Sequence, residues 1–293
     1  MKDIFPHANT VVAIEESKLL KRFEYDILID AKGLPAALGI LNKANYFRTY
    51  ETAEAPSYGA MLDDLTRDLM DLIKEISPDV VVWKLFALYY DIHNLKLVAK
   101  ERFTGKRLDG LYLDYGSYTL PTLRSAAVRE SDNILNDAVL TAGLFEALRA
   151  SDMYDIDFIL DKTYFAALTS YASRLGVKHI SSFIKERTDL YNVSVYFQTM
   201  AAGNPEGYFR RAFSDMGSSP LDEWERYVLA GREEAQKFPL WQKYEPFWRN
   251  AENRQQLFSE FDVLRDNYLI EKTKPCKLMA FGVLPICAFF LIS

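Results

Sequence analysis

The sequence predicts an all-α fold, and three observations carry that prediction. Apolar residues recur at helical spacing over long stretches, and no persuasive period-two alternation, the pattern of a strand, accompanies them. Glycine and proline are few, 13 and 11 among 293 residues, which suits long regular elements better than a turn-rich β-sandwich. Apolar residues make up 49% of the chain, so it can bury a large core, as one extended domain or as two to three units.

The clearest helix is expected at 58–77. Its apolar residues step by three and four, and its charged residues fall mainly on the opposite face. The stepping residues are Leu62, Leu65, Leu69, Leu72 and Ile76. Pro56 and Ser57 precede this helix and Pro78 ends it.

A second long helix is expected to follow in "VVVWKLFALYYDIHNLKLVAKERFTG". This stretch is apolar on nearly every side until about Tyr90, which is typical of a helix buried all round, and Gly105 is a suitable C-cap. The closing stretch "LMAFGVLPICAFFLI" has 15 residues, fewer than the roughly 20 that span a bilayer. It is therefore interpreted as a buried helix, with a tail anchor as the alternative.

Further helical stretches complete the pattern. They are expected at 8–29, 36–46, 120–129, 133–149, 156–174, 178–201, 220–236 and 252–270. Pro35, Pro121 and Pro220 fall at first-turn positions of three of them, where a helix tolerates proline.

A pair of polar residues recurs along the chain. Asp91 and Asn94 return as Asp189 and Asn192, an offset of 98 residues (189 minus 91), and Asn9 begins a weaker first copy that lacks the aspartate. In each copy a proline follows the asparagine, and a glycine shortly precedes that proline. The prolines are Pro35, Pro121 and Pro220, which follow their asparagines by 26, 27 and 28 residues, and the glycines are Gly33, Gly116 and Gly217.

This ordered set predicts three copies of one helical unit, at approximately 1–78, 79–176 and 177–293. Because asparagine is a poor helix former, each recurring asparagine is expected to satisfy a backbone or neighbouring polar group rather than to bind a ligand. "FILDKTYF" and "DVLRDNYL" also align, with Tyr164 over Tyr268, and the spacing predicts that the chain stops where its next unit would begin.

Composition argues against several functions. A net charge of −6 disfavours a general nucleic-acid surface, although it leaves room for a basic patch on one face. The two cysteines, Cys276 and Cys287, exclude a disulfide framework and suit a reducing cytoplasm. His7, His93 and His179 are too few and too scattered for a zinc site, and no phosphate-binding loop or dinucleotide fingerprint occurs.

The best candidate for an enzyme site is "DDLTRD", which contains Asp63, Asp64 and Asp68. All-α isoprenoid enzymes hold Mg²⁺ and a diphosphate with such a cluster. Their second metal motif is not matched, because "NDAVLTAGLFE" places Leu140 and Leu144 where a hydroxyl and a carboxylate belong. A solvated helix face is the preferred interpretation of the aspartates, and the Mg²⁺ enzyme is kept as an alternative.

Four phrases together resemble a known family. "FPHANTVVAIEESKLL", "YDIHNLKLVAKERFTGK", "FILDKTYF" and "FGVLPICAFFL" are similar, in the right order, to the C subunit of V-type (A/V-type) ATPases, the counterpart of the eukaryotic V-ATPase d subunit. The resemblance covers essentially the whole chain.

The resemblance implies a funnel of three helical subdomains about a pseudo-threefold axis. It implies no active site and no cofactor, but a rotor part that joins the central-stalk (D/F-type) subunits of the soluble head to the membrane proteolipid ring. Such a part would lie at the cytoplasmic face of the membrane without spanning it. Members continue past the "FGVLP" helix, so the third subdomain is expected to be incomplete here. A helical-repeat adaptor outside any ATPase is the other alternative.

Overall fold

The computed structural model is helical, and no strand occurs in the residues that it describes. These are residues 5–43, 58–77, 79–129, 134–202, 205–230, 237–244, 254–277 and 282–290. The all-α prediction is therefore confirmed. The chain forms two compact units, residues 1–83 with 274–293 and residues 84–273. The division into three helical subdomains stays a prediction.

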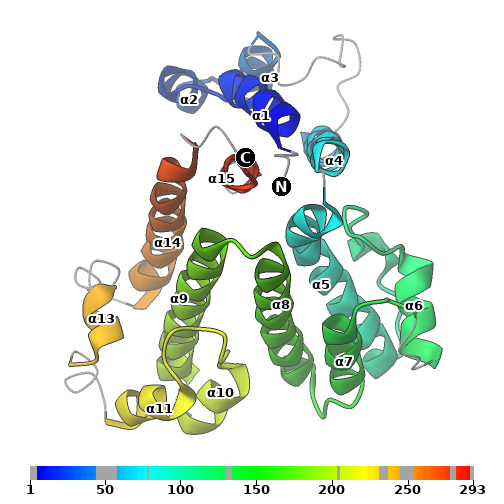
Figure 1. Cartoon of the computed structure of the whole chain (residues 1–293), viewed down its shortest axis with the longest axis vertical. Helices are drawn as coiled ribbons and strands as arrows, with labels where there is room; N and C mark the ends of the chain where they lie inside the picture. Colours follow the sequence, from blue (N-terminus) through cyan, green and yellow to red (C-terminus); the bar gives the residue numbers. More distant parts are fainter. Residues whose placement is uncertain are drawn as a thin grey trace. The chain divides into compact units, whose positions relative to one another are not determined.

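The first unit combines both ends of the chain. In it α1 (Pro6–Lys18) packs against α15 (Leu284–Phe290) and α4 (Tyr58–Ile76), while α2 (Arg22–Ile29) packs against α3 (Leu34–Lys43) (Figure 1). Buried side chains lie on each side of the contact with α15. They are Ala8 and Val12 on α1 and Ile286 and Ala288 on α15. Within the closing apolar stretch, 278–292, a helix is thus present over Leu284–Phe290 and residues 285–288 are buried, while residues 278–281, 291 and 292 lie outside the described residues.

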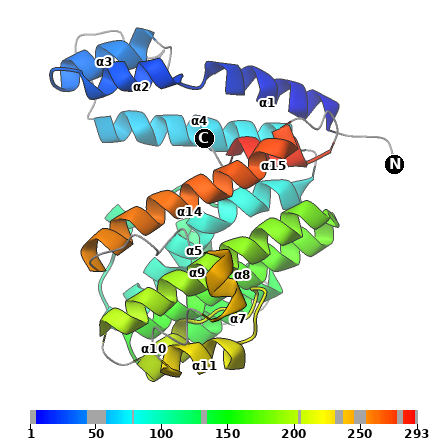
Figure 2. The ribbon, with the colours of Figure 1, turned by 90° about the vertical axis from the view of Figure 1, so that its left-hand side faces the viewer.

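The second unit is built around two long antiparallel helices, α8 (Met153–Leu175) and α9 (Lys178–Ala202). The other elements are α5 (Val80–Thr104), which begins in the first unit, η1 (Asp109–Leu111), α6 (Leu120–Arg129), α7 (Ala138–Ala147), α10 (Pro205–Ala212), α11 (Leu221–Ala230), α13 (Pro239–Lys243) and α14 (Arg254–Lys277), which ends in the first unit. Helix α7 packs on α8, and α10 contacts both α8 and α9. Figure 2 shows α10 and α11 at the end of α8 and α9 that lies away from their connection.

Aromatic side chains form much of the core beside α9. Trp224 of α11 lies edge-on to Phe238, with ring centroids 5.1 Å apart, and tilted against Phe209 of α10 at 5.8 Å. Each of the three is at most 1% exposed. Rings packed in this way add specific geometry to the burial of a large apolar area, so they fix the short helices α10 and α11 to the long one.

Two predictions about the first unit are wrong in detail. The single helix expected at 8–29 is interrupted, because Leu19 is extended (ψ 145°) and Lys21 starts a new helix, its N–H donating to Glu24 Oε2 at 2.7 Å. The apolar face of α4 is also displaced. Leu62 is 49% exposed, whereas Met61 and Ile73 are buried.

Most other predicted helices agree with the structure to within a few residues. Helix α6 has the predicted bounds, and Gly105 caps α5 with a φ of 70°. Helix α7 starts five residues later than expected, because Asn136 has a φ of 47° and Asp137 is the N-cap. The short helices α10 and α13 were not predicted. Residues 44–46, 133, 231–236 and 252–253 of the predicted helices lie outside the described residues.

Candidate functional site

The recurring asparagines pair with the backbone of the segment that follows their helix. On α5, Asn94 Nδ2 donates to the carbonyl oxygen of Leu113 at 2.7 Å, and its Oδ1 accepts from the N–H of the same residue at 3.0 Å. On α9, Asn192 makes the same two bonds with Ser214, at 2.8 and 3.0 Å. Both asparagines are fully buried. A carboxamide can satisfy one donor and one acceptor at once, which explains this residue type inside a helix.

The recurring aspartates accept hydrogen bonds from a second position in each of the segments that follow α5 and α9. Asp91 Oδ1 accepts the N–H of Ser117 at 2.7 Å, and Asp189 Oδ1 accepts the N–H of Ser218 at 2.7 Å. The hydroxyl of Ser218 also donates to Asp189 Oδ2 at 2.7 Å. Asp91 is 2% exposed and Asp189 is fully buried, so each carboxylate is shielded from water and held by N–H donors.

A glycine lies against each carboxylate. A Cβ on Gly116 would meet Asp91 Oδ1 at 2.3 Å, and a Cβ on Gly217 would meet Asp189 Oδ1 at 2.5 Å. Both approaches are far shorter than a van der Waals contact, so only glycine fits. We name the Asp, Asn and Gly of each copy a clamp: Asp91, Asn94 and Gly116 form the α5 clamp, and Asp189, Asn192 and Gly217 the α9 clamp.

The recurring prolines stand just beyond these segments. Pro121 is the second residue of α6 and Pro220 directly precedes α11, with its carbonyl oxygen accepting the N–H of Trp224 at 3.3 Å. Pro35 is the second residue of α3. Proline suits a helix start because the N–H that it lacks would have no partner within the first turn. The clamps therefore fix each connecting segment directly before its next helix begins.

The first copy is built differently. Asn9 Nδ2 donates to the carbonyl oxygen of Gly282 at 3.1 Å, a partner 273 residues away. Gly33 has a φ of 91°, so glycine is required there by its backbone conformation rather than by an approaching carboxylate. The structure thus brings Asp91 with Asn94 and Asp189 with Asn192, while Asn9 joins the two ends of the chain.

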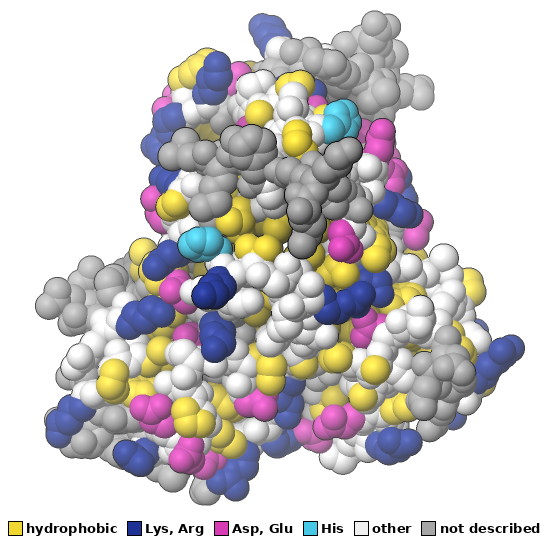
Figure 3. All heavy atoms as spheres, viewed as in Figure 1, with side chains coloured by type: hydrophobic (Ala, Val, Ile, Leu, Met, Phe, Trp, Pro, Cys, Tyr) yellow, Lys and Arg dark blue, Asp and Glu magenta, His cyan; other side chains and the backbone are white. Residues whose placement is uncertain are grey.

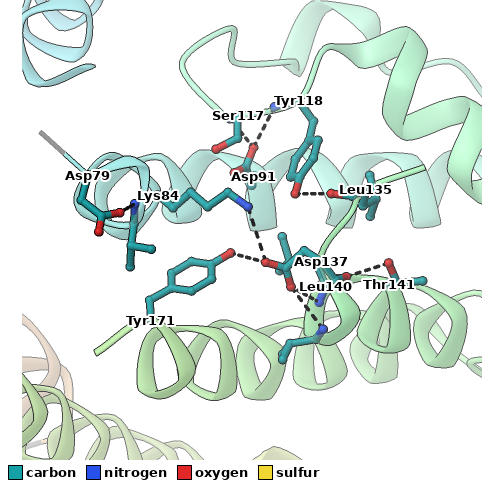
Figure 4. A network of polar contacts seen from close by, with 12 residues as sticks. Asp79, Lys84, Asp91, Ser117, Tyr118, Leu135, Asp137, Leu140, Thr141 and Tyr171 are labelled. Atoms are coloured by element: carbon teal, nitrogen blue, oxygen red, sulfur yellow. Dashed lines mark hydrogen bonds and ion pairs between the residues drawn. The ribbon is translucent and has the colours of Figure 1, made fainter. Parts of the chain in front are cut away.

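Figure 4 shows Asp91 of the α5 clamp within a wider polar network. Asp137 caps α7 by accepting from the N–H of Leu140 at 3.1 Å, and its other oxygen accepts the hydroxyl of Tyr171 at 2.6 Å. Lys84 Nζ lies 3.8 Å from that oxygen. Burial raises the pKa of Asp91 to about 6, with its N–H donors and Lys84 acting against that shift, and burial also raises the pKa of Asp189.

The raised pKa of Asp91 predicts a pH-dependent stability. In the unfolded chain this carboxyl titrates near its usual value, so between about pH 4 and pH 6 the folded state holds the proton more tightly. The free energy of unfolding that Asp91 contributes is present below that window. It is lost as the pH rises through about 6, a change of up to about 3 kcal/mol.

Urea denaturation of the wild type and of Asp91→Asn, each at pH 4.5 and at pH 7, measures this effect. The wild type should lose stability relative to the variant at the higher pH. An identical difference at both values would contradict the prediction. The comparison between the two proteins removes the contributions of all other titrating groups.

Sequence reasoning missed the partners of the clamps. Ser117 and Ser218 each follow the clamp glycine, so the pair Gly-Ser recurs at 116–117 and 217–218, a signal that was present but is too common to single out. Leu113 and Ser214 take part only through their backbones, which no sequence pattern reveals. Lys84, Asp137 and Tyr171 meet only through tertiary packing.

Comparison with known proteins shows the family of the chain that contains these clamps. The family model described as the ATP synthase (C/AC39) subunit matches residues 8–292. The chain belongs to this family. The clamps are parts of the helical scaffold of this C/AC39 chain. The resemblance of the four sequence phrases to the C subunit of V-type ATPases is confirmed.

Two curated relatives agree with this assignment. The chain is similar to the C subunit of the V-type sodium ATPase of Enterococcus hirae, with 23% identity over 96% of this chain and 87% of the relative. It is also similar to the C subunit of the A-type ATP synthase of Methanocaldococcus jannaschii, with 25% identity over 69% of this chain and 56% of the relative. Both names denote parts of an ATPase complex, which agrees with the expectation of a non-catalytic subunit.

The aspartates of the alternative Mg²⁺ site lie on an exposed helix face. Asp63, Asp64 and Asp68 are all exposed on α4, and no group of three or more potential metal ligands occurs in the described part of this C/AC39 chain. Leu140 and Leu144, at the ligand positions of the second motif, are fully buried on α7. The two motifs therefore supply no set of oxygen ligands.

The histidines, the cysteines and the apolar helices supply no further candidate site among the described residues. His7 and His179 are exposed, and His93 lies 3.0 Å from the carbonyl oxygen of Leu111. Cys287 is buried on α15, and the side chain of Cys276 lies outside the described residues. A search of the helices in the described ranges finds none that is long and apolar enough to cross a membrane.

Proposed function

We propose that this C/AC39 chain is the non-catalytic rotor part that joins the central stalk of a V-type rotary ATPase or ATP synthase to the membrane proteolipid ring. The family match over residues 8–292 is the observation that carries the proposal. The names of both relatives, the C subunits of a V-type and of an A-type complex, support it. In this role the chain would sit peripherally at the cytoplasmic face and couple ATP chemistry to H⁺ or Na⁺ movement.

The interior of the second unit suits such a part. A coupling part must transmit torque without deforming, and its stiffness comes from dense packing and from hydrogen bonds that fix buried segments. The α5 and α9 clamps each fasten a connecting segment at two points, and the aromatic cluster around Trp224 fixes α10 and α11 on either side of the segment that the α9 clamp holds. Every feature of the clamps serves position, and no reacting group is needed.

The proposal predicts that the purified chain binds a reconstituted central stalk of D- and F-type subunits as a one-to-one complex, and that it hydrolyses no ATP alone. Analytical ultracentrifugation and an ATPase assay measure both. A folded chain that does not bind the stalk, or that hydrolyses ATP unaided, would overturn the proposal.

Two alternatives remain distinguishable from this role. The Mg²⁺ enzyme requires that Asp63→Ala or Asp68→Ala abolish a diphosphate-dependent reaction, whereas the rotor part tolerates both on an exposed helix face. A helical-repeat adaptor would co-purify with partners other than stalk and proteolipid subunits.

A further inference from the structure

The connection between α8 and α9 carries cations that have no carboxylate partner. Arg174, Lys178 and Lys185 are exposed, and none of them forms an ion pair with a residue in the described part of the chain. Two lysines of α5 in the same unit are paired with carboxylates of α8. Lys96 Nζ lies 2.6 Å from Asp161 Oδ1, and Lys100 Nζ lies 2.7 Å from Asp157 Oδ1. Among the residues that the structure describes, no carboxylate therefore compensates the positive charge at this connection.

The only carboxylate of this stretch is already engaged. Glu186 Oε1 lies 3.4 Å from Lys243 Nζ, Oε2 lies 3.6 Å from Lys272 Nζ, and the hydroxyl of Tyr268 donates to Oε2 at 3.0 Å. These contacts place two more cations, Lys243 and Lys272, beside Glu186 on α9. Five cations against one carboxylate leave a charge of +4 (five minus one) on a chain whose net charge is −6.

We call this surface the basic face. Its members are Arg174, Lys178, Lys185, Glu186, Lys243 and Lys272. Lys178 and Lys185 are seven residues, or two turns, apart on α9, so they share one side of the helix about 10 Å from each other. Figure 3 shows dark blue side chains gathered over the ends of α8 and α9 where the two helices join.

We infer that the basic face is the docking surface for an acidic helical segment of the central stalk, an inference that rests on the proposed function. Carboxylates two turns apart on a helix lying alongside α9 would match the spacing of Lys178 and Lys185. Complementary charge of this kind steers association and fixes register. The fixed negative charge of Glu186 within the basic face suits a protein carrying both signs of charge better than a uniformly anionic bilayer.

The composition of the basic face also favours the stalk over the membrane ring. None of the large exposed apolar side chains of the described residues falls between 174 and 187. In the same unit, exposed apolar residues lie elsewhere, for example at Phe103, Leu111 and Val128 near the far end of α5 and on α6. A partner that meets mainly charged and polar side chains is itself polar.

Charge reversal tests the inference. The double variant Lys178→Glu with Lys185→Glu is expected to bind the reconstituted D/F stalk at least about tenfold more weakly than the wild type near 0.1 M salt, mainly through a slower association rate, and the difference should shrink near 0.5 M salt. The matched control is Arg102→Glu with Lys106→Glu, which changes the net charge equally at exposed cations that have no ion pair among the described residues. The control should bind within about twofold of the wild type.

Carbodiimide cross-linking of the wild-type complex identifies the partner. This reagent joins an amine to a carboxylate that is in direct contact, so Lys178 or Lys185 should be recovered by mass spectrometry as an amide with an aspartate or glutamate of the stalk. A cross-link to the proteolipid ring in the whole complex, with none to the stalk, would overturn the inference.

Each further outcome has one meaning. If the wild type fails to bind the stalk, the proposed function fails. If the wild type and the reversal variant bind equally, only the basic face is wrong. If the reversal variant keeps stalk binding but loses sedimentation with vesicles of equal parts phosphatidylcholine and phosphatidylglycerol, the face is a lipid-binding surface and the inference is overturned.

Discussion

Gly217→Ala is expected to lower the free energy of unfolding by about 3 kcal/mol, with Gly116→Ala close behind. In each variant the new methyl group would come within 2.5 Å of a clamp carboxylate, Asp189 in the first and Asp91 in the second. The carboxylate is buried and holds the following serine N–H, so it cannot move aside without leaving polar groups unpaired. Urea denaturation measures the loss.

The control for these variants is Gly110→Ala. Gly110 lies in η1, in the same connecting segment as Gly116, and a Cβ there would meet nothing within 4 Å. Its stability should stay within about 0.5 kcal/mol of the wild type. In a double-mutant cycle, Gly217→Ala and Asp189→Ala should cost less together than the sum of the two alone. Strict additivity would show that the methyl group and the carboxylate do not collide.

Asn192→Asp is expected to cost about 3 kcal/mol or more, and Asn94→Asp to act in the same direction. A carboxylate can still accept from the N–H of Ser214 but cannot donate to its carbonyl oxygen, which Asn192 Nδ2 reaches at 2.8 Å in the wild type. The change would also place a negative charge at a fully buried position one turn from Asp189. Thermal or urea denaturation measures the effect.

Asn267→Asp is the matched control, because it makes the same chemical change at an exposed position of α14. It should leave the unfolding transition nearly unchanged. Equal stability of Asn192→Asp and Asn267→Asp would mean that the paired amide contacts of the α9 clamp contribute little.

Local signals predicted much of the fold. Helix α6 and the end of α5 follow from a proline and a glycine that act through the backbone of the residues beside them, so no knowledge of packing was needed. The interruption after Lys18 was missed because it depends on a backbone conformation at Leu19 and on the Glu24 side chain, within an otherwise helical composition. The face of α4 was displaced because Met61 and Ile73 are buried by neighbours that lie elsewhere in the sequence.

The sequence predicts the helix residues of the clamps but not their partners, for a related reason. Asp91, Asn94, Asp189 and Asn192 recur at a fixed offset, so their repetition is visible in the sequence. Their partners are backbone groups that carry no residue identity. The basic face was not predictable at all, because its cations come from α8, α9, α13 and α14, and the folded chain alone decides which cations pair with carboxylates.

The bond between Asn9 and Gly282 imposes an order of events during synthesis on the ribosome. Residues 84–273 form their unit from one continuous stretch, so it can fold while the remainder is still being translated. The other unit needs α1 to meet α15, which is translated much later. Until then the side of α1 that packs on α15 stays exposed. Pairing Asn9 with Gly282 closes a loop of 273 residues, which favours slow folding of this unit. A chaperone that binds exposed apolar helix faces would therefore act on α1 in that interval.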